Sequence, residues 1–272
     1  MVVRTFLLSV AVLLVAVAAG ATARPPDRCL ACHPPHYRQQ GSCSDCHRGN
    51  PAAARKSIAH AGLLAGRYAV FTLPGSPVVK KGERLLEQFA CRRCHVSGGR
   101  GNRLAASLDA VAAERSPAEI VAAIGNPAEG MPRFAIGDAQ LTAVVNGLYY
   151  GGTRGKGGEE RPRVVFFEKR GAADDLFTRK CGSCHRLLSE RLGALGRSDA
   201  GPNLSGLLTP HYPRNAGPGV PWTEQRLKDW LYNPRTVRPW SLMQPVRLSD
   251  GELHELMRIL TVTHRKDPAS FR

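Results

Sequence analysis

The chain has 272 residues and a formal net charge of +16. This length has room for one large domain or two small ones. The positive charge alone would suggest a nucleic-acid partner. However, aromatic residues make up only 6% of the chain and do not alternate with the basic ones, so we expect no nucleic-acid partner.

Residues 1–23 are typical of a cleaved signal peptide. Arg4 gives a positive start, residues 6–19 form a mostly apolar run, and residues 21–23 fit a cleavage site of the A-x-A type. The run of about 14 residues is shorter than the roughly 20 that a membrane-spanning helix needs, and no second run approaches that length. We therefore expect a soluble protein that is exported to the periplasm.

The cysteines are grouped in an unusual way. In an oxidising compartment eight cysteines would normally form disulfides. All eight instead fall into C-x-x-C units, and each unit is followed directly by histidine, which neither disulfides, redox dithiols nor zinc ribbons require. The four units are Cys29 and Cys32 with His33, Cys43 and Cys46 with His47, Cys91 and Cys94 with His95, and Cys181 and Cys184 with His185.

This spacing suits covalently bound haem. Residues i and i+3 of a helical turn share a face, so both thiols can reach the two vinyl groups of one porphyrin. The histidine at i+4 lies on the same side, where its imidazole can bind the iron. C-x-x-C-H is the attachment motif of c-type cytochromes, which the chain resembles. We therefore expect four haem c groups, attached through the eight cysteines and bound by the four histidines that follow them.

Four haems also change how the charge is interpreted. Loss of Arg4 with the signal peptide leaves +15, and the eight propionates of four haems would bring the protein to about +7 before iron is counted. A positive face that binds an acidic redox protein is the interpretation that we favour.

Residues 24–76 are predicted to form a dihaem segment with little regular structure. The segment has no methionine, so we expect both of its irons to have two histidine ligands. His36 is too close in sequence to His33 to reach the other face of the same haem. We therefore assign His36 to the haem of His47, and His60 to the haem of His33. Alternatively, one of the two assigned residues is a surface histidine, and one iron is open or bound by a distant residue.

Residues 77–150 form the first of two similar units, with three predicted helices. One helix leads into the third cysteine unit, with apolar residues at helical spacing over residues 85–89. The next begins with a capping box of Ser116 and Glu119 and ends at residues 126–127. The third covers residues 137–150 and turns four apolar side chains inward: Leu141, Val144, Val145 and Leu148.

Residues 151–163 are predicted to be a Gly-rich charged linker, whose roughly 20 Å span does not fix how the flanking units dock. The second unit, residues 164–264, repeats the order helix, haem motif, loop, helix, loop, helix, and its last helix has a capping box of Ser249 and Glu252. Residues 265–272 are a tail. The predicted fold is therefore mainly α, with each unit built from three to four helices around a haem that replaces a large apolar core.

Two methionines are candidates for the sixth position on iron. Met131 and Met243 lie in proline-containing loops between the second and third helix of each unit. A loop methionine beside proline is poor core material and a good soft ligand, so we predict that both bind haem iron. Met257 lies within the last helix and is expected to pack in the core. Three further histidines are expected to be surface or partly packed residues: His211, His254 and His264.

The second unit resembles class I cytochrome c domains over nearly its whole length, through "CGSCH", "GPNLSGL", "WTEQRLKDWLYNP" and "RPWSLM" in that order. The resemblance implies that the carbonyl of Pro202 accepts a hydrogen bond from His185 and that Trp222 donates one to a haem propionate. The first unit has "GRGNRLA" in place of the proline segment, which leaves the carbonyl of Asn102 as the candidate acceptor there.

The whole-chain pattern, in which "HPPHY" and "GSCSDCHRGNPAAARKSIAH" precede two class I units, resembles multihaem cytochromes from operons for selenite and tellurite reduction. Histidine in place of methionine as a sixth ligand generally lowers the potential of a haem, so the ligands predict a low-potential pair followed by two higher-potential haems, as suits an electron carrier in an anaerobic respiratory chain with no catalytic residues of its own. The resemblance implies a metalloid-reduction chain as the setting of this carrier. Its partner would be a redox protein, a membrane-bound quinol-oxidising complex or an outer-membrane electron conduit. The alternative is an enzyme, a multihaem reductase or a dihaem peroxidase, which would need one open iron with acid–base groups beside it.

Overall fold

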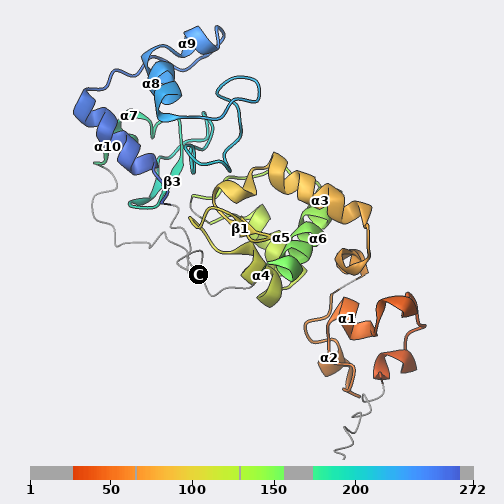
Figure 1. Ribbon diagram of the computed structural model, residues 1–272. Helices are drawn as coiled ribbons and strands as arrows, with labels where there is room; N and C mark the ends of the chain where they lie inside the picture. Colours follow the sequence, from red (N-terminus) through yellow and green to blue (C-terminus); the bar gives the residue numbers. More distant parts are fainter. Residues whose placement is uncertain (1–26, 65, 129, 156–173, 264–272) are drawn as a thin grey trace, which may run out of the picture.

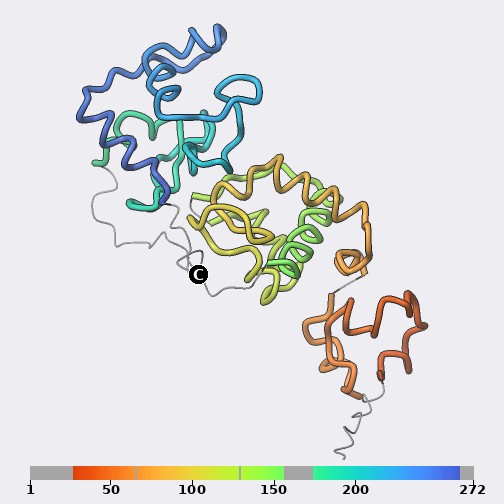
Figure 2. The backbone as a smooth tube through the Cα atoms, in the orientation of Figure 1, coloured from red at the N-terminus to blue at the C-terminus, as the bar shows by residue number. Residues whose placement is uncertain are grey.

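The computed structural model describes residues 27–64, 66–128, 130–155 and 174–263 (Figure 1). These residues are mainly helical and follow one another in three parts: the N-terminal segment, the first unit and the second unit (Figure 2). The expected signal peptide, most of the linker and the tail lie outside the described residues. Within these ranges no helix combines the length and apolar character needed to cross a membrane.

The N-terminal segment contains only short helical turns separated by loops. The cysteine units themselves form two of these turns, because the backbone NH of each histidine bonds back toward its own unit, as His33 N does to Cys29 O at 2.9 Å. The elements are η1 Arg28–Ala31, η2 Arg38–Gln40, α1 Cys43–His47, α2 Lys56–Ala59, η3 Gly66–Tyr68 and η4 Val70–Thr72.

The end of this segment packs into the first unit rather than beside it. Leu64, Tyr68 and Phe71 are buried in the same apolar cluster as the helices of the first unit, and the Phe71 ring stacks on Tyr149 with ring centroids 5.3 Å apart. Arg48 adds a polar contact, because its guanidinium donates to the carbonyl of Ala112 at 2.8 Å. In terms of packing, the first unit therefore begins before residue 77.

The first unit has four helices: α3 Pro77–Gln88, α4 Leu108–Glu114, α5 Pro117–Gly125 and α6 Asp138–Arg154. Helices α3 and α6 cross in close contact at Gly82, where a Cβ atom would overlap the carbonyl oxygen of Ala143. Between α3 and α4 lie the turn η5 Cys91–Arg93 and the small antiparallel pair β1 Val96–Ser97 and β2 Arg100–Gly101.

The second unit is built from α7 Leu176–Lys180, α8 Glu224–Tyr232, α9 Pro234–Val237 and α10 Asp250–Leu260. A β-hairpin of β3 Leu187–Ser189 and β4 Gly193–Leu195 follows its cysteine unit. Phe177 is fully buried in the core of this unit, and Met257 of α10 is 8% exposed in the same cluster, as predicted for a core residue.

The helices predicted from the sequence are present, with one error at the linker. The capping boxes at Ser116 and Ser249 begin α5 and α10 as expected. However, residues 151–154 were assigned to the linker, and they continue α6 instead. Glycine disfavours a helix, but here Gly152 lets α6 approach α4 so closely that a Cβ atom would lie 3.0 Å from that of Ala112, and this packing outweighs the local propensity.

Candidate haem sites

The first unit contains a cavity with a volume of about 540 Å³ that brings four predicted site residues together: Cys91, Cys94, His95 and Met131. The other side chains around it are mostly apolar, including Phe89, Leu104 and Phe134. This size lies in the range of cofactor pockets. The groups that would hold a haem c are therefore all present in this mostly apolar cavity: two thiols, an imidazole and a thioether.

The turn that carries the third cysteine unit explains how these residues reach the cavity. Ala90 has a left-handed backbone (φ 52°), which turns the chain sharply at the end of α3. The amides of Cys94 and His95 both bond to the carbonyl of Cys91, at 3.2 and 3.0 Å. This compact turn keeps the two thiols and the imidazole on one side.

The ring of His95 is held by a backbone carbonyl that the sequence did not predict. Its Nδ1 lies 2.8 Å from the carbonyl oxygen of Ala106, so the proposed acceptor Asn102 is wrong. Asn102 is buried and directly follows β2, and its side-chain amide donates to the carbonyl of Arg93 at 2.8 Å. Because Nδ1 is engaged with Ala106, Nε2 remains available to bind a metal ion.

Burial sets the protonation states in this cavity. It raises the pKa of the Cys91 thiol to about 11 and also raises that of Cys94. It lowers the pKa of His95, which keeps the imidazole neutral, and the neutral form is the one that binds metal ions.

The second unit holds its histidine in the way that the resemblance implies. The Nδ1 atom of His185 lies 2.8 Å from the carbonyl oxygen of Pro202, and the His185 amide bonds to Cys181 O at 2.9 Å. Burial raises the pKa of Cys181 to about 11, whereas Cys184 is exposed.

The other two predicted residues of the second unit have partners within the protein. The indole NH of Trp222 donates to Asn215 Oδ1 at 2.7 Å, so the expected propionate donor is bonded to an amide oxygen in this structure. The sulfur of Met243 is partly buried against the core and accepts a hydrogen bond from Trp230 Nε1 at 3.0 Å. A thioether sulfur has two lone pairs, so this contact leaves one free for a metal ion.

In the N-terminal segment the histidines lie in the pairs that the sequence predicted. The ring centroids of His33 and His60 are 6.0 Å apart, and those of His36 and His47 are 5.5 Å apart. Two imidazoles that bind one metal ion from opposite sides have centroids about 6 Å apart, because each nitrogen–metal bond is about 2 Å and each ring centre lies about 1 Å behind its nitrogen. Both pairs therefore have a spacing that fits a shared iron.

A second cavity accompanies one of these pairs. It has a volume of about 400 Å³ and is lined by His36, His47, Cys43 and Cys46 together with apolar residues in and beside η4. His47 Nδ1 lies 3.0 Å from the carbonyl oxygen of Leu64, which holds this ring in the same way as His95 and His185 are held. The residues of this cavity also fit a haem c.

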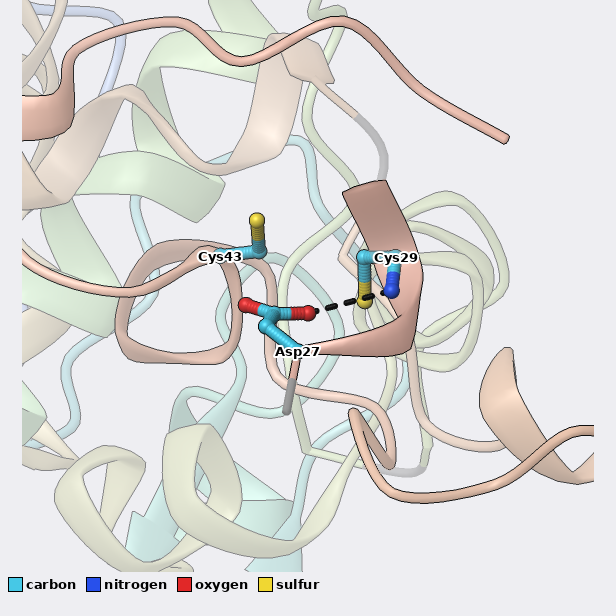
Figure 3. A group of neighbouring side chains, drawn as sticks. All are labelled: Asp27, Cys29 and Cys43. Carbon is cyan, nitrogen blue, oxygen red and sulfur yellow. Dashed lines mark hydrogen bonds between the residues drawn. The ribbon is translucent and has the colours of Figure 1, made fainter. Parts of the chain in front are cut away.

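Asp27 is a residue of this region that the sequence analysis missed. Its carboxylate lies between Cys29 and Cys43, with the three ligand-type atoms all within 4.8 Å of one another (Figure 3). It caps η1 by accepting from the Cys29 amide at 3.1 Å, and its hydrogen bond with the Cys29 thiol raises the pKa of that thiol to about 11. An aspartate directly before a helical turn is an N-cap signal that could have identified it.

The structure describes two of the three remaining histidines. His254 is exposed on α10 and His211 is half-buried, whereas His264 lies outside the described residues.

Comparison with known proteins identifies one part of the chain. Residues 77–146 match the family model of Cytochrome C oxidase, cbb3-type, subunit III. These residues form a cytochrome c domain. Such a domain carries haem c and takes part in electron transfer, in agreement with the cavity of the first unit. No curated protein and no solved structure matches the chain. The haems of the N-terminal segment and the second unit stay predictions.

Proposed function

We propose that the chain is an exported, periplasmic tetrahaem c-type cytochrome that transfers electrons in an anaerobic respiratory or metalloid-reduction chain. The observation that carries this proposal is the spacing of the two histidine pairs, His33 with His60 and His36 with His47. An iron bound by two imidazoles has no free position for a substrate, which favours a carrier over an enzyme.

The ligand types suggest how the electrons are ordered. Histidine in place of methionine at the sixth position generally lowers the reduction potential of a haem. The N-terminal pair would therefore be the low-potential pair, and the two methionine-containing units would have higher potentials. A chain with such a gradient can connect a strongly reducing donor to a weaker acceptor.

The charge of the chain suggests the kind of partner. The formal charge of +16 falls to about +7 once the signal peptide is lost and eight haem propionates are added, and this positive balance favours a redox protein with an acidic docking surface, because opposite charges steer the encounter of two proteins. A membrane-bound quinol-oxidising complex or an outer-membrane electron conduit with such a surface would suit this role.

A carbon monoxide difference spectrum of the fully reduced protein, with haem counted on the same sample, tests the proposal. We expect four haems and little rapid binding, because each iron would have two protein ligands. Prompt stoichiometric binding at one haem would instead show an open iron and support a reductase or peroxidase. A count below four would contradict the tetrahaem assignment itself.

A further inference from the structure

The edge of the first unit's cavity at Cys94 is covered by the second unit. Cys94 is only 7% exposed and forms a small apolar cluster with Leu104 of its own unit and Leu188 of β3. Leu188 also lines the cavity that holds His95. The corresponding cysteine of the second unit, Cys184, is exposed. The two equivalent cysteines therefore differ in exposure, and the side chain that covers Cys94, Leu188, comes from the second unit.

Hydrogen bonds fix this contact at its polar border. The guanidinium of Arg93 donates to the carbonyl of Asn203 at 3.1 Å, and the side-chain amide of Asn203 donates to the carbonyl of Gly130 at 3.4 Å. The buried side chain of Asn102 donates to the Thr209 hydroxyl oxygen at 2.9 Å. Hydrogen bonds between buried polar groups on the two sides of a contact favour one arrangement of those sides.

Gly206 allows the two units to approach this closely. A Cβ atom at this position would lie 2.6 Å from the carbonyl oxygen of Arg93 and 2.7 Å from Nδ2 of Asn102, and both atoms belong to the first unit. Only a residue without a side chain fits here, so the backbone of the second unit lies directly on the turn that carries Cys91 and Cys94.

The contact also joins the two candidate haem sites through few bonds. Arg93 stands between the two cysteines of the first unit, and Asn203 directly follows Pro202, whose carbonyl oxygen lies 2.8 Å from His185 Nδ1. The Arg93 side chain, the backbone of Asn203 and two hydrogen bonds thus connect the attachment turn of one site with the histidine of the other.

We propose that the second unit forms a permanent wall of the first unit's haem site, and that the first site exchanges electrons with the second unit rather than with an external protein at the Cys94 edge. The inference rests on the proposed electron-transfer function. One electron passes between the sites, so that one is oxidised and the other reduced, and no bond or proton changes place. The exposed edge at Cys184 is then the one that remains open to an external partner.

The substitution Gly206→Ala in the full-length haem-loaded protein tests this proposal, with Gly219→Ala as its matched control. Both glycines have a backbone φ of +69°, so both substitutions carry the same local strain, but a Cβ atom at Gly219 meets nothing within 4 Å. Amide hydrogen exchange over residues 93–105 and 203–209 reports whether the units stay docked. The rate of internal electron transfer after flash reduction, which does not depend on protein concentration, reports the exchange between sites.

We expect Gly206→Ala to lose amide protection on both sides of the contact and to slow internal transfer at least tenfold relative to Gly219→Ala, because its methyl group separates the units. Equal protection and equal rates in the two variants would overturn the proposal. Haem content and reversible reduction of each site, measured on the same samples, test the proposed function separately. An electron carrier whose two units do not dock would bind and reduce its haems normally, but its amide protection and internal transfer rate would be the same in both variants.

A second pair of variants applies if Gly206→Ala does not fold. Arg93→Met removes the charged hydrogen bond to Asn203, and Arg100→Met is its control, because Arg100 is exposed and pairs with Glu87 of its own unit. Loss of a charged hydrogen bond is expected to shift the equilibrium between docked and separated units by about tenfold. Unchanged amide exchange and transfer rates in Arg93→Met would contradict the proposal.

Discussion

At the scale of single residues, three of the four histidines that follow the cysteine units are held by the same kind of hydrogen bond. Nδ1 lies 3.0 Å from the Leu64 carbonyl oxygen in His47, 2.8 Å from that of Ala106 in His95 and 2.8 Å from that of Pro202 in His185. A backbone carbonyl accepts from Nδ1 and leaves Nε2 without its proton. Each ring is therefore prepared as a metal ligand by the fold alone.

His60→Ala tests the histidine pairs. We expect one haem of the N-terminal segment to change from low-spin to high-spin, because His33 would lose the imidazole that faces it at 6.0 Å. Electron paramagnetic resonance of the oxidised protein measures this change. His254→Ala, at an exposed position on α10, is the control. A spectrum identical to that of the control would remove His60 from the site.

Met243→Ala tests the sixth ligand of the second unit. If the sulfur binds iron, its loss should remove one near-infrared band from sulfur-to-iron charge transfer and lower one reduction potential. Leu242→Ala is a suitable control, because Leu242 is the neighbouring residue and is 91% exposed. An unaltered near-infrared spectrum in Met243→Ala would mean that the sulfur serves only Trp230, whose indole NH lies 3.0 Å away.

At this scale the sequence predicted the residues that are defined by a motif or by chain distance. The pairing of His36 with His47 followed from the short chain segment between His36 and His33, which is a purely local constraint. The acceptor of His95 could not be found in the same way, because a backbone carbonyl has no residue signature and its position depends on how the loop up to Ala106 returns to the cavity. Asp27 was missed although its N-cap signal was local.

At the scale of elements, the crossing of α3 and α6 depends on one glycine. Gly82→Ala should lower the free energy of unfolding by about 1–3 kcal/mol or more, because the added methyl group overlaps the Ala143 carbonyl oxygen and forces the helices apart. Thermal unfolding of the haem-loaded protein measures the loss. Gly125→Ala, where a Cβ atom meets nothing within 4 Å, should cost little. Equal stability of both variants would show that the helices can separate freely.

The capping box of α5 gives a pH-dependent contribution to stability. Hydrogen bonds from the backbone NH and hydroxyl of Ser116, with a weaker one from Arg115, lower the pKa of Glu119 to about 2. Because the pKa is lower in the folded state, the stabilisation is present above the ordinary value of 4.5 and is lost as the pH falls toward 2.

Glu119→Gln should therefore be less stable than the wild type at pH 6, and the difference should shrink as the pH falls through this range. Chemical denaturation at a series of pH values measures it, with Glu114→Gln at the end of α4 as the control. A stability difference that does not change with pH would show that the carboxylate charge plays no part in the cap.

The elements that the sequence predicted are those with local signals. Capping boxes and apolar periodicity marked α5, α6 and α10, and these helices are present. Helix α4 and the hairpin of β3 and β4 were missed, because they are short and their stability depends on packing against other parts of the fold. The extension of α6 to Arg154 was missed for the same reason, since Gly151 and Gly152 disfavour a helix locally and are outweighed by close packing, of Gly151 against Ser97 and Gly98 and of Gly152 against α4.

At the scale of the whole molecule, the sequence established how many cysteine units there are, but not how the parts contact one another. A linker can join units that dock or units that move independently, and its composition does not distinguish the two. The docked arrangement depends on side chains such as Asn102 and Leu188, whose partners are more than 80 residues away in the chain. Such contacts have no periodic signal in a single sequence.

The net charge leads to a prediction for the protein as a whole. If acidic partners bind the basic surface, the second-order rate constant for electron exchange with an acidic redox protein should fall by about tenfold or more as the ionic strength rises. Salt screens the attraction, since the Debye length falls from about 10 Å at 0.1 M to about 3 Å at 1 M. Stopped-flow kinetics measures this rate. Exchange with an uncharged small-molecule mediator is the control and should hardly change, because no field steers it. A rate with the acidic protein that is equally insensitive to salt would mean that the net positive charge does not guide docking and that the contact is mainly apolar.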